Sequence, residues 1–159
     1  MFLRILKFLR LPMTMIAIFT IARYFIGLAG VPYAPRGNAM FSIVGLTLVS
    51  AIYFGAMSGK VGGLSRLSPV LIGLTLAFWS QILIFLATWL SYATGHEAVS
   101  YFTHWDSLNF KVPTPAPPMV DALKLRLGGF VVFPVICTVA AYLGRGLGLL
   151  LVDEPKSGK

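Results

Sequence analysis

Long apolar runs alternate with short polar segments along this chain. Four runs are long enough to predict membrane-spanning α-helices, over residues of about 12–30, 39–57, 69–92 and 130–152. Each reaches or approaches the roughly 20 apolar residues that a helix needs to cross a bilayer. Prolines, glycines and charges gather in the segments between the runs, as is typical of connectors. The pattern predicts a single all-α domain, a polytopic membrane protein of residues 1–159.

The first eleven residues have a pattern of their own. Arg4, Lys7 and Arg10 recur every three positions, so a helix would place them on one face, while phenylalanines, leucines and an isoleucine cover the rest. Such a basic amphipathic helix suits the bilayer interface. We expect Pro12 to open the next helix, where its missing N–H costs nothing.

The only long polar stretch, residues 93–128, predicts a structured outer loop. It carries an aromatic cluster that is either a docking surface or part of an ordinary connecting loop, namely Tyr101, Phe102, Trp105 and Phe110. Four prolines at 113–118 favour an extended strip. We expect a short separate helix at 119–127, divided from the last span by Gly128 and Gly129.

Composition supports a membrane protein and argues against nucleic-acid binding. Hydrophobic residues make up 57% of the chain and charged residues 11%, whereas soluble domains have roughly 25% charged residues. The net charge is +8, from 13 Lys and Arg against 5 Asp and Glu. These basic residues stand singly between apolar runs, which is the pattern of juxtamembrane charges that face anionic lipid.

The distribution of lysine and arginine predicts the topology. With the N-terminus inside, the inner side holds most of the basic residues, namely Arg4, Lys7, Arg10, Lys60, Arg66, Arg145, Lys156 and Lys159. Three of the five on the outer side lie in the 93–128 loop, where Glu97, Asp106 and Asp121 offset them. The positive-inside rule therefore places both termini in the cytoplasm. We expect a bacterial inner membrane, because many small bacterial proteins share this four-span architecture.

Small residues recur at four-residue spacing in two spans. One set is Ala51, Gly55, Gly59 and Gly63, and the other is Ala140, Gly144 and Gly148. This spacing places each set on one helix face and allows a neighbouring backbone to approach closely. The neighbour is either a helix of this same bundle, which we favour, or a helix of another protein.

Three of the polar residues inside the spans are candidates for a functional role. Arg145 lies about 10 Å from the end of the last span, where it either extends toward the interface or binds an anionic partner such as a lipid phosphate or a carboxylate. Ser80 and Gln81 lie near the middle of the third span. We expect both to be polar residues between helices, and Gln81 to form hydrogen bonds between them, with the lining of a pore or ligand site as the alternative.

Several absences narrow the function. All five acidic residues lie in the loop or the tail, which argues against a proton-coupled pump. Neither histidine lies in a span, and the single cysteine, Cys137, cannot form an intrachain pair. The spacing of His96, Glu97, His104 and Asp106 matches no metal motif. No serine-hydrolase elbow, H-E-x-x-H motif or P-loop is present. We therefore expect no catalysis, cofactor or metal.

These observations predict a non-catalytic protein. The leading hypothesis is a small accessory, assembly or scaffold subunit that binds membrane lipids and other membrane proteins, or a second copy of itself. The alternative is an oligomeric channel or facilitator for a small solute, with Ser80, Gln81 and Arg145 along its path.

Overall fold

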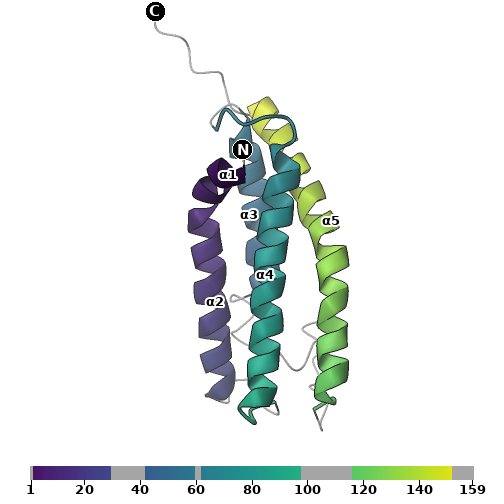
Figure 1. The fold of residues 1–159 in the computed structure, drawn as a ribbon. Helices are drawn as coiled ribbons and strands as arrows, with labels where there is room; N and C mark the ends of the chain where they lie inside the picture. Colours follow the sequence, from purple (N-terminus) through teal and green to yellow (C-terminus); the bar gives the residue numbers. More distant parts are fainter. Residues whose placement is uncertain (1, 30–41, 60–61, 98–115, 152–159) are drawn as a thin grey trace, which may run out of the picture.

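The protein is an all-α bundle (Figure 1). A computed structural model describes residues 2–29, 42–59, 62–97 and 116–151. Within these ranges the helices are α1 (Phe2–Phe8), α2 (Arg10–Leu28), α3 (Ile43–Ser58), α4 (Ser68–Ala93) and α5 (Met119–Leu151). Three of them, α2, α4 and α5, are long and apolar enough to cross a membrane, and α3 is a shorter apolar helix. The expected fold class is confirmed: this is a helical integral membrane protein.

Proline explains the break between α1 and α2. In a continuous helix the ring of Pro12 would clash with the carbonyl group of residue 8, four positions earlier. Phe8 is the last residue of α1, and α2 begins at Arg10, two residues before the predicted start. The apolar face of α1 is anchored in the bundle: Ile5 and Leu9 are buried, and the Phe8 ring packs edge-on against Phe54 of α3 at 5.2 Å.

Caps and prolines also set the starts of α3 and α4. The side chain of Ser42 accepts a hydrogen bond from the main-chain N–H of Gly45 at 3.1 Å, which is a standard N-cap. Pro69 lies in the first turn of α4, where no partner for its nitrogen is needed. The expected third span matches α4 to within one residue at each end.

The start of α5 corrects one prediction. Residues 119–127 are not a separate helix, because α5 runs without interruption from Met119 through Gly128, Gly129 and Pro134. Two glycines weaken a helix by about 1 kcal/mol each, but packing on a neighbouring helix outweighs local propensity. Here the side chain of Gln81 in α4 fills the space next to Gly129, where a Cβ atom would overlap it.

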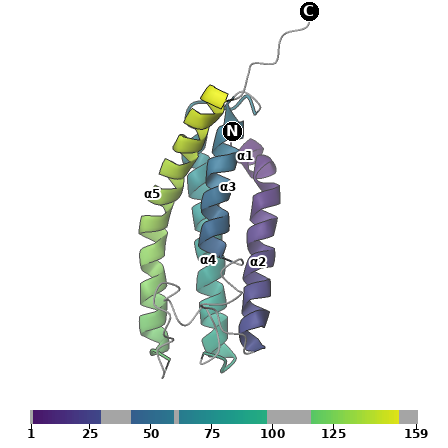
Figure 2. The same cartoon turned by 180° about the vertical axis from the view of Figure 1, so that it is seen from behind.

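The helices form two unequal parts. The helices α3, α4 and α5 pack against one another extensively, while α2 makes fewer contacts with α3 and α4. Figures 1 and 2 show α2 and α5 on opposite sides of the α3–α4 pair. The first helix and the end of α5 lie at the same end of the bundle (Figure 1). We call this the inner end, following the predicted topology, and the opposite one the outer end.

Candidate functional site

The two faces of small residues lie against each other within the chain, except for Gly63, which is not on the helix because α3 ends at Ser58 and Gly63 lies in the following connector with φ +54°. A Cβ atom on Gly55 would overlap the main-chain carbonyl of Ala141, and one on Gly148 would overlap that of Ala56. Ala51 and Ala140 are buried in the same core. Gly59 lies at the edge, where a Cβ atom would be 3.7 Å from the side chain of Leu149. The predicted faces thus bring α3 and α5 into close contact with each other.

Gly144 makes the tightest of these contacts. A Cβ atom on Gly144 would overlap the carbonyl group of Ile52 and crowd the Cα atom behind it. The obstacle is backbone, which cannot move aside as a flexible side chain can. Any larger residue at this position must therefore push α3 and α5 apart.

Sequence reasoning missed a similar contact between α4 and α5. A Cβ atom on Gly73 would lie 2.5 Å from the main-chain nitrogen of Thr138. Gly73 is four residues before Ala77, which is fully buried. The same four-residue spacing that identified the other two faces was present in this span and could have revealed this one.

Arg145 holds the connector between α3 and α4. Its guanidinium donates to the main-chain carbonyl of Ser65 at 2.7 Å and to that of Leu64 at 3.4 Å, and it also reaches the hydroxyls of Ser58 at 3.3 Å and Ser68 at 3.4 Å. All four are neutral oxygens of the same chain. The expected anionic partner is therefore not needed to satisfy these donors.

A second arginine binds the same connector. Arg4 of α1 donates to the main-chain carbonyl of Gly62 at 3.1 Å. The connector between α3 and α4 is thus fastened to both the first helix and the last one. Through the connector, α1 and α5 are therefore linked at the inner end of the bundle.

The two polar residues of α4 differ in their surroundings. The hydroxyl of Ser80 donates to the carbonyl of Ala77 in its own helix at 2.9 Å. A serine hydroxyl inside a helix commonly reaches back to its own backbone in this way. Gln81 is only 6% exposed, and its carboxamide lies against Gly129 of α5. Gln81 therefore contacts the neighbouring helix, and its hydrogen bonding between helices stays a prediction.

Polar side chains from three helices meet at the outer end. Tyr92 donates a hydrogen bond to the carbonyl of Pro117, and the hydroxyls of Tyr24 and Thr94 are 3.3 Å apart. The guanidinium groups of Arg23 and Arg126 are close enough to interact electrostatically. In the part of the chain that the structure describes, no three His, Cys, Asp or Glu side chains are placed to hold a metal ion.

The remaining predicted residues of the outer loop are not described. Tyr101, Phe102, Trp105 and Phe110 lie outside the described residues, as do His104 and Asp106. The proposal of an aromatic docking surface stays a prediction.

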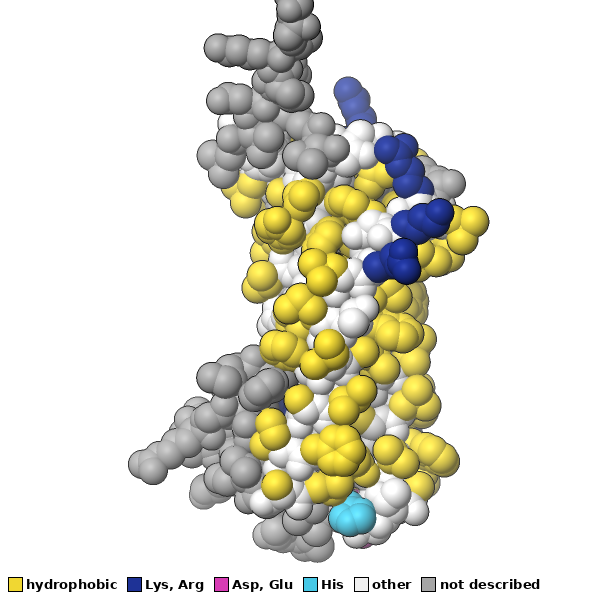
Figure 3. Space-filling view, turned by 90° about the vertical axis from the view of Figure 1, so that its left-hand side faces the viewer, with side chains coloured by type: hydrophobic (Ala, Val, Ile, Leu, Met, Phe, Trp, Pro, Cys, Tyr) yellow, Lys and Arg dark blue, Asp and Glu magenta, His cyan; other side chains and the backbone are white. Residues whose placement is uncertain are grey.

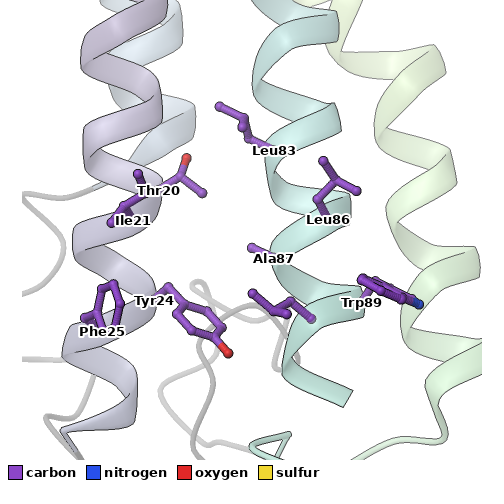
Figure 4. A pocket seen from close by; sticks show the side chains of 9 residues that line it. Thr20, Ile21, Tyr24, Phe25, Leu83, Leu86, Ala87 and Trp89 are labelled. Atoms are coloured by element: carbon purple, nitrogen blue, oxygen red, sulfur yellow. The ribbon is translucent and has the colours of Figure 1, made fainter. Parts of the chain in front are cut away.

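Loose packing of α2 leaves two hollows along its seam with α4. The outer hollow has a volume of about 350 Å³ and is lined mainly by carbon: Figure 4 shows Tyr24 and Thr20 of α2 facing Leu83 and Ala87 of α4. The inner hollow, of about 460 Å³, is lined by Leu6, Arg10, Met13, Thr14, Ala17 and Trp79. Both volumes fall within the range of small-molecule sites.

Charge is distributed unequally between the two ends. The inner end carries five described basic residues, Arg4, Lys7, Arg10, Arg66 and Arg145, and Figure 3 shows Lys and Arg side chains gathered there. The carboxylates within the described ranges, Glu97 and Asp121, both lie near the outer end, at the end of α4 and the start of α5. The inner end is therefore strongly positive.

Comparison with known proteins gives no family assignment. No family model, no curated protein and no solved structure matches this chain.

Proposed function

We propose that this protein is a non-catalytic subunit that binds a transmembrane helix of another membrane protein through the outward face of α5. The observation that carries the proposal is Gly146. A Cβ atom built there would meet nothing within 4 Å, whereas the neighbouring glycines at 144 and 148 are both packed against α3. Of these three glycines, Gly146 is thus the one whose lack of a side chain is not explained by packing against another described residue.

An open glycine in a helix calls for an explanation. Glycine inside a helix is less stable than alanine by roughly 0.5–1 kcal/mol, and at Gly146 no internal contact offsets this. Around it, Val139, Leu143 and Leu147 form an exposed apolar ridge on the same side of α5. Small residues within such a ridge allow a second helix to approach closely. A partner helix seated over Gly146 would account for both features.

The proposal extends to lipid and to topology. Five described basic residues lie at the inner end, against three at the outer end, Arg23, Lys124 and Arg126, where the two described carboxylates also lie. This distribution favours a cytoplasmic location for both termini. The exposed Arg4, Lys7 and Arg10 on α1 and α2 would then face the anionic headgroups of that leaflet. A bacterial inner membrane fits this arrangement.

The alternative of a solute facilitator requires a path between copies of the chain. The buried hydroxyls of Thr47, Ser80 and Thr88 donate to carbonyls of their own helices and so are not free to line a path through the bundle. Copies would therefore have to meet at an outer surface, for which the α5 ridge is again the best candidate.

Native mass spectrometry of the protein, extracted gently from its own membranes, tests the proposal. We expect other polypeptides in fixed ratio, lost from the Gly146→Leu variant and kept in Val49→Leu, which adds bulk at a lipid-facing position of α3. Because Gly146 is open, the variant should unfold like the parent protein. A protein without other polypeptides contradicts the proposal. A homo-oligomer lost in Gly146→Leu would favour the facilitator and lead to flux measurements in liposomes.

A further inference from the structure

The inner hollow between α2 and α4 is a groove. Arg10, Met13 and Ala17 follow one another along α2 at intervals of three or four residues, so they share a face. Leu6 joins them from α1, across the break at Leu9. The opposite wall is Trp79 of α4, whose indole N–H donates to the main-chain carbonyl of Met13 at 2.9 Å. That bond joins α2 and α4 beside the groove.

The lining of the groove changes from charged at the inner rim to apolar deeper in the bundle. Arg10, at the inner rim, is exposed and has no hydrogen bond from its side chain to any described residue. Seven residues deeper, roughly 10 Å along the helix axis, the walls consist of Ala17 and the ring of Trp79. The hydroxyl of Thr14 donates to the carbonyl of Arg10 at 2.9 Å and needs no further acceptor. The groove therefore has a cationic mouth and an apolar floor.

The surroundings of the mouth reinforce its charge. Lys7 lies three residues before Arg10 and is also exposed. No carboxylate in the described ranges lies at this end to compete for either cation. The first helix ends just beside the mouth, and its exposed Leu3 and Phe2 place this level of the molecule at the boundary between headgroups and hydrocarbon.

From this arrangement we infer that the groove binds one anionic phospholipid of the inner leaflet. The phosphate lies at Arg10, supported by the charge of Lys7, and an acyl chain lies along Met13, Ala17 and Trp79. The inference deepens the lipid-binding part of the proposed function and is independent of the partner helix on α5. The charge of the mouth favours this occupant over a neutral lipid, and the apolar floor favours it over a free phosphate ion.

The test is native mass spectrometry of the full chain with added dioleoyl phosphatidylglycerol or dioleoyl phosphatidylcholine. We expect one phosphatidylglycerol to be retained in preference to phosphatidylcholine. Arg10→Gln should weaken its binding about five-fold, as expected for one basic residue near a lipid surface. Arg66→Gln, which removes the same charge from the connector, should leave binding unchanged. Ala17→Phe should remove the bound lipid of either type by filling the floor.

Each contrary result has a definite meaning. Equal losses in Arg10→Gln and Arg66→Gln would show a diffuse charge effect and overturn the site. Displacement of the lipid by glycerol phosphate would show a site for free phosphate. A co-purifying polypeptide lost only in Arg10→Gln would show an acidic protein partner. Either result would overturn the inference of a lipid site. If lipid binding fails while other polypeptides still co-purify, the proposed function stands without this site. If the lipid is retained and no polypeptide co-purifies, only the α5 proposal fails.

Discussion

Single residues show where sequence is informative and where it is not. Arg145 stood out in the sequence because an arginine inside an apolar span needs a partner. Its partners were not predictable, since the nearest acceptors are main-chain carbonyls of Leu64 and Ser65, and a carbonyl group is the same in every residue. The glycines Gly55, Gly144 and Gly148 were predictable as contact sites because their spacing alone defines a face. Which helix they touch follows only from the fold.

Replacing Arg145 tests whether its hydrogen bonds hold the connector between α3 and α4 in place. Arg145→Met keeps much of the side-chain volume but removes all donors to the connector. Hydrogen bonds to charged groups contribute about 1.5–3 kcal/mol when buried, and because Arg145 is only half-buried we expect a loss of roughly 1–2 kcal/mol in the free energy of unfolding. Amide hydrogen exchange of residues 62–67 should become faster. Arg66→Met is the control. Unchanged exchange in Arg145→Met would contradict the role of Arg145 in holding the connector.

Elements were predicted best where a proline marks their start. The starts of α2 and α4 lie next to Pro12 and Pro69, and local chemistry acts there. The start of α5 was predicted wrongly because Gly128 and Gly129 resemble a break when only local propensity is considered. Gln81 of α4 lies against the helix at this point, and packing on a neighbouring helix has no local signal. The second span was predicted to start at residue 39, whereas α3 starts four residues later, at Ile43.

The role of Pro12 can be tested with Pro12→Ala. Alanine restores a donor for the carbonyl of Phe8 and removes the ring clash, so α1 should continue along the axis of α2. The first helix would then move away from the connector that Arg4 now contacts. Spin labels at Lys7→Cys and Arg66→Cys, in a Cys137→Ala background, should give a longer distance by electron–electron double resonance. An unchanged distance would show that the buried Ile5 and Leu9, rather than Pro12, set the angle.

The whole molecule combines an apolar body with a positive inner end. Its membrane character and the number of apolar helices followed from the sequence, because run lengths and composition are one-dimensional properties. The seam between α2 and α4 did not, since the grooves arise from how far apart two helices lie. The candidate residues of the inner groove, apart from Arg10, looked like ordinary core positions in the sequence.

Topology is the whole-molecule property most open to test. With both termini inside, the end of the bundle that carries Lys7 faces the cytoplasm, and the end that carries His96 faces outward. In a Cys137→Ala background, a membrane-impermeant maleimide added to intact cells should label His96→Cys and spare Lys7→Cys until the cells are lysed. The reverse pattern would show that the chain is inserted the other way. Labelling of both positions in intact cells would indicate dual insertion.

The shortness of α3 has a consequence for the membrane itself. Its 16 residues span about 24 Å at the helical rise, against a hydrocarbon thickness of about 30 Å, while the 26 residues of α4 exceed it. One side of α3 faces outward, with Val49 and Tyr53 exposed. Lipids beside α3 and lipids beside α4 therefore meet surfaces of different height. Hydrophobic mismatch of this kind is relieved by local thinning of the bilayer, so the protein should deform its surroundings on one flank only and favour thinner membranes.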